Sequence, residues 1–469
     1  MSVTWTEPDI AECEYGKPPS IWWCVIAFVV VQIAGIVITI LTWEQGKSVI
    51  SGTFFVRALL LPLFIWGAVT AVIYTNYEEW IARVDRWNYL CRCKCARWKR
   101  WARSHVAILG SVALTPEPEL AERLVGLEGR APMNPGKIMA LPETEASAGV
   151  SRIGQVIERL IAPFAARVMR LAPVHTFEVM LHSEDESDIN ELQAVWRKLA
   201  LSDLAKLRWA PLDAKTARIE QWFDADLHSG FRLVLGCQLH REGKEPVCSE
   251  AAVAILLASP AVLDTFERKL KPQARLFRPI SVPPDSVTDA VDVLLAAEQT
   301  TRGRIRHMWS SGLSRQGRHA TSGAIKDARL NLAEHDVDGA IGKPGPVNGL
   351  LLQALAAQMV EHGQGVQLIA SPDSQRVMLN LLGTQVTPVP HVGSGHARML
   401  RLSTTIGVTC CIVFFVFLLD MASASAGWFW GCLAAFVLLF PLQIGGAMLT
   451  CREVEEDFHR KLRRSPEQV

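Results

Sequence analysis

The sequence predicts a membrane protein in which an α/β domain lies between two pairs of transmembrane helices. Apolar residues concentrate in residues 21–74 and 402–449. Lys and Arg concentrate just outside the two apolar regions, after residue 74, before residue 402 and after residue 449. Between the two regions, segments with strand-like periodicity alternate with segments with helix-like periodicity. The formal net charge of the whole chain is only +1, so overall electrostatics predict no nucleic-acid partner.

Four segments are apolar over the roughly 20 residues that a helix needs to cross a bilayer. They are Ile21–Leu41, Phe54–Tyr74, Leu402–Leu419 and Trp428–Leu449. Arg57 lies one turn inside the second of these spans, where its side chain can reach the membrane surface. The residues before the first span are mostly acidic, and no small-residue cleavage site follows it. We therefore expect a retained span and not a signal peptide.

The distribution of Lys and Arg near the span ends predicts the orientation in the membrane. Basic residues follow the second and fourth spans and precede the third, whereas the connectors Thr42–Thr53 and Asp420–Gly427 hold one Lys between them. Both connectors are therefore expected to face away from the cytoplasm, with both termini and the middle domain inside. The high Ala, Leu and Arg content and the short connectors favour the inner membrane of a bacterium.

These patterns divide the chain into seven parts. In chain order they are a cytoplasmic tail (1–20), a transmembrane hairpin (21–74), a basic aromatic juxtamembrane helix (75–105), a small unit with a linker helix (106–171), the α/β cytoplasmic domain (172–396), a second transmembrane hairpin (397–449) and a basic cytoplasmic tail (450–469).

The juxtamembrane segment combines aromatic rings with bases, which favour the headgroup region and anionic lipids. It is expected to be an amphipathic helix lying on the inner leaflet. Its membrane-interface residues are predicted to be Trp80, Trp87, Arg92, Lys94, Trp98, Lys99, Arg100 and Trp101. Cys91, Cys93 and Cys95 lie there too, but only the first and last would share a helix face. A structural zinc site uses four ligands, so no metal site is predicted.

The middle of the chain alternates between strands and helices, which indicates an α/β fold with a sheet covered on both faces. The predicted strands are Thr176–Leu181, Phe231–Leu239, Ala251–Leu257, Leu276–Ile280, Arg304–Trp309 and Gly365–Ala370. The predicted helices are Ser187–Leu201, Val287–Ala297 and Asn348–Val360. A basic stretch around Gly312, which includes Arg315, Arg318 and His319, fits a solvated hairpin or a surface for an acidic partner.

Two segments of this domain resemble the thiolase and β-ketoacyl synthase fold. Residues 231–257, FRLVLGCQLHREGKEPVCSEAAVAILL, are similar to its paired core strands, and residues 336–359, DVDGAIGKPGPVNGLLLQALAAQM, to its late glycine loop and buried helix. The resemblance covers roughly residues 175–385. It implies a nucleophilic Cys in a small-residue loop that opens a buried helix, a His in a His-Gly-Thr loop, and a second His after an Asn and a Gly.

The residues that the resemblance requires for catalysis are not present. Cys237 lies in the middle of an apolar strand, and the late loop reads Gly345, Pro346, Val347 and Asn348 where the second His would stand. The resemblance therefore implies a degenerate relative that does not condense acyl groups. No catalytic residue and no cofactor is predicted.

The loop before the predicted helix at residue 348 is the one candidate for binding a small ligand. Backbone N–H groups at a helix start can hold an anion, and here they would come from Gly342, Lys343 and Gly345, with the Lys343 side chain assisting. The alternative is an ordinary tight turn.

These observations lead to three functional hypotheses. The first is a scaffold or adaptor that recruits a soluble protein to the membrane, with an accessory role in a bacterial secretion system, as effector adaptor or immunity protein. The second is a membrane-bound enzyme of acyl or lipid metabolism, which requires Cys237 or Cys248 beside His240 or His307. The third is a small transporter, which requires a polar path between the spans.

Overall fold

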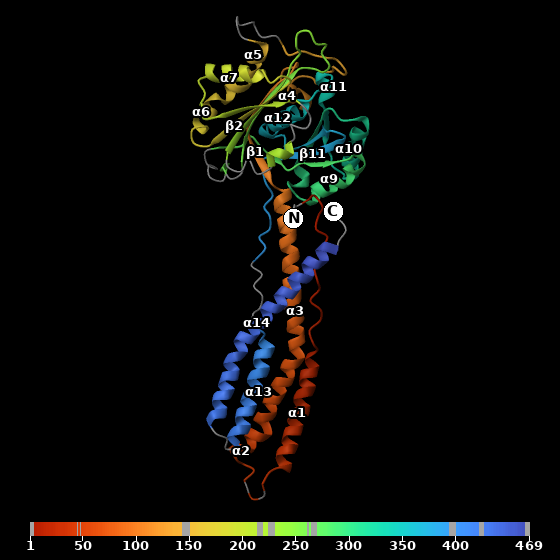
Figure 1. Cartoon of the computed structure of the whole chain (residues 1–469). Helices are drawn as coiled ribbons and strands as arrows, with labels where there is room; N and C mark the ends of the chain where they lie inside the picture. The colour runs from red at the N-terminus through yellow and green to blue at the C-terminus, as the bar shows by residue number, and fades with distance from the viewer. Residues whose placement is uncertain are drawn as a thin grey trace. The chain divides into compact units, whose positions relative to one another are not determined.

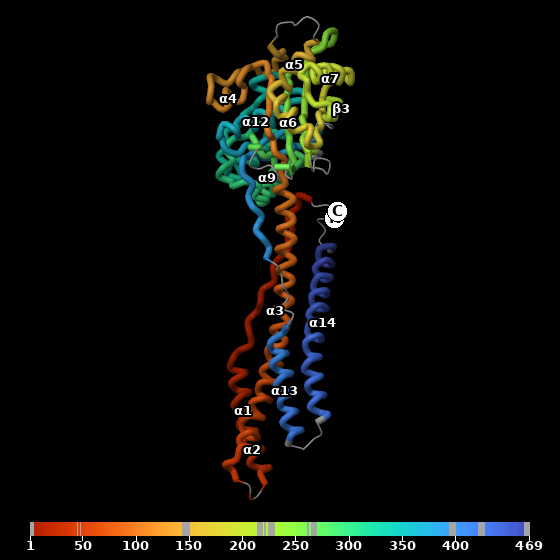
Figure 2. Tube along the Cα trace, turned by 90° about the vertical axis from the view of Figure 1, so that its left-hand side faces the viewer, coloured from red at the N-terminus to blue at the C-terminus, as the bar shows by residue number. Residues whose placement is uncertain are grey.

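The computed structural model describes the chain except for residues 1–3, 45, 47, 143–150, 213–218, 224–229, 260–261, 264–269, 394–399, 422–425 and 465–469. The chain forms two compact units, which Figures 1 and 2 show from two sides. Unit 1 comprises Met1–Glu7 and Trp98–Val389, and unit 2 comprises Pro8–Arg97 and Pro390–Val469.

Unit 1 is built on one mixed sheet whose strand order is β3-β2-β4-β5-β1-β6-β11-β10-β8-β9, with β7 paired to β11. The strands are β1 His105–Leu114, β2 Thr176–Ser183, β3 Lys206–Pro211, β4 Gly230–Gln238, β5 Ala251–Ala258, β6 Ala274–Phe277, β7 Ile280–Val282, β8 Ile305–Ser310, β9 Ala333–Asp336, β10 Val366–Asp373 and β11 Arg376–Gly383. The mixed α/β sheet that the sequence predicts is confirmed.

The sheet consists of two halves with the same topology. In the first half β2 pairs parallel with β3 and β4, and β5 pairs antiparallel with β4 and β1. In the second half β8 pairs parallel with β9 and β10, and β11 pairs antiparallel with β10 and β6. The halves join where β1 pairs antiparallel with β6. Unit 1 therefore contains an internal structural duplication.

Helices cover both faces of this sheet. They are α4 Leu120–Val125, α5 Arg152–Ile161, α6 Ala165–Leu171, α7 Asp188–Lys198, α9 Val287–Ala296, α10 Arg315–Asp327, α11 Val337–Ile341 and α12 Asn348–Glu361, with short 3₁₀ turns η2 Ala162–Phe164, η3 Ile219–Phe223, η5 Pro284–Ser286 and η6 Arg302–Arg304. One hydrophobic cluster packs α5, α6 and α7 on the first half, and another packs α9 and α10 on the second (Figure 1).

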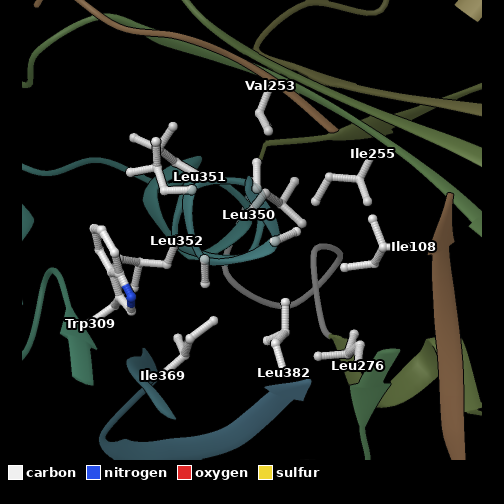
Figure 3. Close-up of a cluster of buried hydrophobic side chains, with 14 of the residues drawn as sticks. Ile108, Val253, Ile255, Leu276, Trp309, Leu350, Leu351, Leu352, Ile369 and Leu382 are labelled. Carbon is white, nitrogen blue, oxygen red and sulfur yellow. The ribbon is translucent and has the colours of Figure 1, made fainter. Parts of the chain in front are cut away.

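Helix α12 lies in the core between the two halves. Eleven of its fourteen residues are buried, which is the pattern of a helix enclosed on all sides. Figure 3 shows it between the side chains of Val253 and Ile255 from the first half and those of Ile369 and Leu382 from the second. Its buried Gln353 exchanges two hydrogen bonds of 3.0 Å with Asn380 on β11, which satisfies both amides.

Two sequence-based expectations for this unit were wrong. The apolar run from residue 106 is not part of a separate small unit, because β1 lies inside the sheet between β5 and β6. A short apolar run fits a strand whose two faces are both covered, but the sequence does not show which sheet such a strand joins. The basic residues Arg315, Arg318 and His319 lie on helix α10 and not on a hairpin, whereas their role as a surface for an acidic partner stays a prediction. Ser314 caps this helix by accepting a hydrogen bond from Gly317 N.

The first residues of the chain belong to unit 1. The indole of Trp5 donates a hydrogen bond of 2.8 Å to the Pro279 carbonyl and lies edge-on to Trp101 at 5.3 Å. The indole of Trp98 donates to the Thr4 carbonyl at 3.2 Å. Trp98 is only 2% exposed, so its prediction as a membrane-interface residue was wrong.

Arg103 joins the segments by which the chain enters and leaves unit 1. Its guanidinium is buried and donates to the carbonyls of Ala297 at 2.8 Å, Thr387 at 3.2 Å and Pro388 at 2.8 Å. The Glu298 carboxylate accepts a further bond from it at 2.8 Å. A buried charge is tolerated only when it is paired and hydrogen-bonded, and here four acceptors serve one side chain.

Unit 2 contains four helices that are long and apolar enough to cross a membrane, as predicted. Its elements are α1 Ile21–Leu41, α2 Gly52–Phe55, the π-helical turn η1 Val56–Leu60, α3 Leu61–Ala102, α13 Leu402–Met421 and α14 Ala426–Arg464. Helices α3 and α14 have 42 and 39 residues. At about 1.5 Å per residue each is about twice as long as the hydrocarbon core is thick.

The juxtamembrane segment continues α3 without a break, so the expected separate surface helix is not formed. The N-terminal tail runs beside it: the Asn88 amide donates to the Cys13 carbonyl at 3.0 Å and accepts from Cys13 N at 2.8 Å. From α14, Phe458 lies edge-on to Trp87 at 5.2 Å and Lys461 lies over the same ring. Trp87 is therefore held by protein contacts, whereas Trp80 is 49% exposed.

Candidate functional site

Ligands of open α/β sheets bind beyond the carboxyl ends of the parallel strands. In the second half of unit 1 these ends are Ser310 on β8 and Asp336 on β9, and the loop that leads into α12 lies beside them. The end of β4 and the start of β5 contact the same loop. This end of the sheet is therefore the candidate functional site.

Asp338 forms the centre of the first polar cluster at this site. Its carboxyl group accepts hydrogen bonds from Ser311 Oγ at 2.5 Å and from Gly312 N at 2.8 Å. Asn348, the first residue of α12, donates in turn to Ser311 Oγ at 2.7 Å. Burial raises the pKa of Asp338 above its ordinary value. Both Ser311 and Asn348 are buried, so the hydroxyl group is enclosed in the fold.

A second cluster links β4 to the same loop. The Gln238 side chain accepts a hydrogen bond from Val347 N at 3.1 Å and donates to the Ser249 carbonyl. The Ser249 hydroxyl accepts from Met139 N at 3.1 Å and donates to the Lys137 carbonyl at 3.2 Å. These bonds fasten the loop before α12 to the first half of the sheet.

Glu250 forms a third cluster, one residue before β5. Its side chain is fully buried and accepts hydrogen bonds from Leu141 N at 2.6 Å and His240 N at 2.7 Å. Arg152 of α5 supplies two more donors. The Glu250 carboxylate thus accepts hydrogen bonds from three separate segments of the chain. We infer that its role is structural, because it joins these segments.

The loop predicted to bind an anion uses its N–H groups inside the protein. Gly342 N donates to the Asp338 carbonyl at 3.0 Å, Lys343 N to the Lys137 carbonyl at 2.8 Å, and Gly345 N to Asn348 Oδ1 at 3.2 Å. An anion would have to displace these acceptors. Anion binding at Gly342, Lys343 and Gly345 stays a prediction.

Of the thiols that an acyl-transfer enzyme would use, Cys237 is buried and Cys248 is partly buried. Burial raises the pKa of Cys237 to about 12 and raises that of Cys248, so both are protonated at neutral pH. The His240 ring contacts the backbone carbonyl of Cys248 at 2.8 Å, and the His307 ring pairs with His335 at 2.9 Å. Within the described part of the chain, neither thiol is hydrogen-bonded to an imidazole.

The duplication offers two places for a buried helix of the kind that carries the family's Cys. One is α12, which begins at Asn348 and follows β9. Its counterpart is the connection between β3 and β4, residues 212–229, where η3 is the helical segment among the described residues. Neither stretch contains a Cys.

Sequence reasoning did not identify Ser311, Asp338, Gln238 or the pair Arg152–Glu250. The sequence does contain a signal for the Arg152–Glu250 pair. Glu250 directly precedes the unbroken apolar run of β5, and a charged side chain at the edge of such a run needs a partner. The membrane-interface residues predicted on α3 are divided between the two units, since Trp98, Lys99, Arg100 and Trp101 belong to unit 1.

No protein-family model matches the chain, and no curated protein matches it. Similar solved structures include a type II polyketide ketosynthase in complex with its acyl-carrier protein, AntDE:AntF (11% identity, 60% of this chain, 100% of that chain, TM-score 0.43). The tetronic acid condensing enzyme AbyA1 (14%, 59%, 99%, 0.38) and OleA of Xanthomonas campestris (12%, 60%, 99%, 0.36) are similar in the same way.

At identities of 11–14% and TM-scores of 0.36–0.43, these are weak likenesses to thiolase-like folds. Their identities of 11–14% concern the fold alone, so they carry no information on activity. The chain therefore combines an α/β unit built on one mixed sheet with four helices that are long and apolar enough to cross a membrane.

Proposed function

We propose that this chain is a polytopic scaffold or adaptor of a bacterial inner membrane, whose non-catalytic α/β unit recruits a soluble protein on the cytoplasmic side. The specific form of the proposal is an accessory role in a secretion system, as effector adaptor or immunity protein. The observation that carries it is the closed hydrogen-bond network at the carboxyl ends of the strands.

This network leaves no poised reactive group among the described residues of the site. Ser311 and Asn348 are buried, and the Ser311 hydroxyl donates to Asp338 and accepts from Asn348. The Cys237 thiol is 2% exposed, with its pKa raised to about 12. A nucleophile needs access to substrate and a lowered pKa or an adjacent base. Ser311 and Asp338 instead hold the start of α12, and Gln238 joins the loop before α12 to the first half of the sheet.

A recruiting surface lies at the opposite, amino-terminal ends of β2, β3 and β4. A cavity of about 610 Å³ opens there, and two large apolar side chains at it are strongly exposed, Val174 at 70% and Leu204 at 67%. Exposed apolar groups beside polar ones are typical of protein-binding surfaces.

The charge of this surface defines the kind of partner. Lys206, Arg208 and Arg232 line the cavity together with one carboxylate, Glu178. Glu178 pairs with Arg208 at 3.2 Å and with Arg232 at 2.8 Å. Because three cations face one anion, the cavity carries net positive charge. We propose that it binds an acidic segment of the soluble protein that also offers apolar side chains.

Co-purification of the full-length chain from membranes tests the proposal. We expect a soluble protein to be enriched in stoichiometric amount and to be released by high salt, because salt screens contacts between exposed charges. The variants Val174→Asp and Leu204→Asp should lose this protein. The matched control Val247→Asp changes a side chain that is equally exposed, at 71%, on the loop between β4 and β5, and should retain it.

The outcomes separate the alternatives. Enrichment of an acyl thioester or a lipid with no protein would contradict the scaffold and support the membrane-bound enzyme. A partner that survives both cavity variants would refute this recruiting surface while leaving the scaffold standing.

A further inference from the structure

Strand β3 is the outermost strand of the sheet in the first half of unit 1. It pairs parallel with β2 on one side, and among the described strands it has no neighbour on the other side. Figure 2 shows it at the margin of the unit. Successive residues of a strand turn their backbone N–H and C=O groups to opposite sides, so about half of these groups in β3 point away from β2. An outer edge of this kind can accept a further strand.

The side chains of β3 alternate between two environments. Lys206 and Arg208 point to one face of the sheet and are exposed, and the Arg208 side chain keeps 61% of its surface. Leu207 and Trp209 point to the other face, where they are half-buried and pack against the hydrophobic cluster of α5, α6 and α7. The Trp209 indole donates a hydrogen bond of 3.0 Å to Ser183 Oγ. An added strand would therefore meet charges on one face and apolar side chains on the other.

The charged face carries more cations than anions. Glu178 of β2 is the register partner of Lys206, but its carboxylate is bonded to Arg208 at 3.2 Å and to Arg232 of β4 at 2.8 Å. One carboxylate thus serves two guanidinium groups beside a third cation. Carboxylates on a strand next to β3 would form cross-strand pairs of opposite charge, which stabilise a sheet.

The same cations oppose the pairing of β3 with a second copy of itself. Two such strands related by a two-fold axis run antiparallel, and opposed residues then point to the same face. In the registers centred on Leu207 or Arg208, a cation of one copy is opposite a cation of the other, and this is destabilising. The register centred on Trp209 avoids the repulsion but places Pro211, which has no N–H, opposite Leu207.

We propose that the recruited protein adds an extended acidic segment to the sheet as a strand beside β3. Its carboxylates, at alternate positions, face Lys206 and Arg208, and the residues between them are apolar and lie beside Leu207 and Trp209. Main-chain hydrogen bonds to the outer edge of β3 supply affinity, and the alternation of side chains supplies specificity. This inference rests on the proposed recruiting surface, because Lys206 and Arg208 also line its cavity.

Fluorescence anisotropy with the full-length chain in nanodiscs tests the strand. The probe is a labelled synthetic peptide of alternating Glu and Val that is as long as β3, six residues. A peptide of alternating Lys and Val is the comparison. We expect the Glu–Val peptide to bind and the Lys–Val peptide not to bind, because only the former complements the cations of β3. Equal binding of the two peptides, or binding of neither, would overturn the proposal.

N-methylation of the peptide separates strand addition from simple charge attraction. In an extended peptide of this pattern the N–H groups of all Glu residues point to one edge, and those of all Val residues point to the other. Methylating the set that faces β3 should weaken binding by about tenfold or more, because several hydrogen bonds are lost together. Methylating the other set should leave binding unchanged. Equal effects of the two sets would show that the peptide is not paired as a strand.

Charge reversal in the chain provides a matched test. The double variant Lys206→Glu/Arg208→Glu changes two exposed side chains, and it should lose the Glu–Val peptide and gain the Lys–Val peptide. The control Arg197→Glu/Lys271→Glu reverses two charges that are also exposed but lie outside β3, and should behave as the wild type. Retention of the Glu–Val peptide by the β3 variant would refute the proposal.

Co-purification distinguishes a failure of this inference from a failure of the proposed function. A soluble partner that is lost in Val174→Asp and Leu204→Asp but kept in Lys206→Glu/Arg208→Glu would refute the added strand and leave the recruiting surface standing. If no soluble protein co-purifies, the recruiting function fails and the added strand fails with it. A dimer of the chain with slow amide hydrogen exchange in β3 would show that a second copy occupies this edge, and would overturn the proposal.

Discussion

Arg152 and Glu250 form a two-point ion pair in which the carboxylate is fully buried and the guanidinium is 44% exposed. The donor–acceptor distances are 2.8 Å and 2.6 Å. The pair connects α5 to the start of β5 and so ties a covering helix to the sheet. Such a bidentate contact fixes the orientation of both groups as well as their distance.

Replacing Arg152 should destabilise unit 1 more than a surface substitution does. In Arg152→Met the buried carboxylate keeps its two backbone donors but loses its charged partner, and we expect the free energy of unfolding to fall by about 2–3 kcal/mol. Thermal unfolding of the full-length chain in detergent, followed by circular dichroism, measures the change. Arg197→Met, on the exposed side of α7, is the control; equal effects of the two variants would contradict the structural role of the pair.

Gly342 should not tolerate any side chain. Its φ of 88° lies in the region that L residues avoid, and an added Cβ would lie 2.1 Å from the Lys137 carbonyl. Gly342→Ala is therefore expected to cost at least about 1–3 kcal/mol from backbone strain. Gly349→Ala, in the first turn of α12 with open space around it, should be neutral or stabilise by up to about 1 kcal/mol. The same melting experiment compares the two, and a Gly342→Ala variant as stable as the wild type would contradict the left-handed conformation of Gly342 and its close approach to Lys137.

The paired histidines should make unit 1 sensitive to acid. Burial lowers the pKa of His335 to about 4 and also lowers that of His307, whereas an unfolded His titrates near about 6.5. Between these values the unfolded chain binds more protons, so stability should fall as pH drops from 6.5 towards 4, by at most about 1.4 kcal/mol per pH unit for His335. Melting temperatures across this range for wild type and His335→Phe check it. A slope that is unchanged in the variant would exclude this histidine as the cause.

Cys237 should be unreactive in the folded protein. With a pKa of about 12, only about one thiol in ten thousand is ionised at pH 8, and the side chain is buried as well. Alkylation by iodoacetamide, followed by peptide mass spectrometry, should leave Cys237 unmodified until the chain is denatured. Because the folded pKa exceeds the unfolded one, this thiol favours the folded state below pH 9, and the benefit is lost as pH rises towards 12. Rapid modification of Cys237 in the folded chain would revive the enzyme hypothesis.

The predicted orientation can be tested with inserted epitope tags. A tag after Lys244, on the loop between β4 and β5, should be inaccessible to antibody in intact cells, whereas a tag after Gly46 in the first connector should be accessible. The physical reason is the cost of moving Arg-rich span ends across the bilayer. Surface labelling of the tag at residue 244 would reverse the assigned topology.

Strongly apolar elements could be predicted from the sequence, and weakly patterned ones could not. The runs that form β4, β5 and α12 were recognised because nearly all their residues are buried. The edge strand β9 has four residues, two of them exposed, and its place depends on pairing with β8 rather than on its own composition. The duplication is likewise invisible without strand order, since it is a property of pairing.

The candidate site was less predictable for a similar reason. Asp338, Ser311 and Asn348 lie on three segments, and only tertiary structure brings them together. The thiolase-like resemblance indicated which residues to look for, and in the late loop the chain has Gly345, Pro346, Val347 and Asn348 where the resemblance implies a His. It could not show that hydrogen bonds between the halves occupy that region instead.

The contacts of Trp5 affect how this protein can be dissected. Met1–Glu7 belongs to the same unit as Trp98–Val389, although about ninety residues of unit 2 separate them along the chain. A fragment that starts at Trp98 would lack the Trp5 indole, which donates a hydrogen bond to the Pro279 carbonyl and packs against Trp101. A cavity would be left where this indole lies. Supplying the first seven residues, fused to the start of the fragment or as a separate peptide, should fill this cavity and improve the yield of the folded fragment.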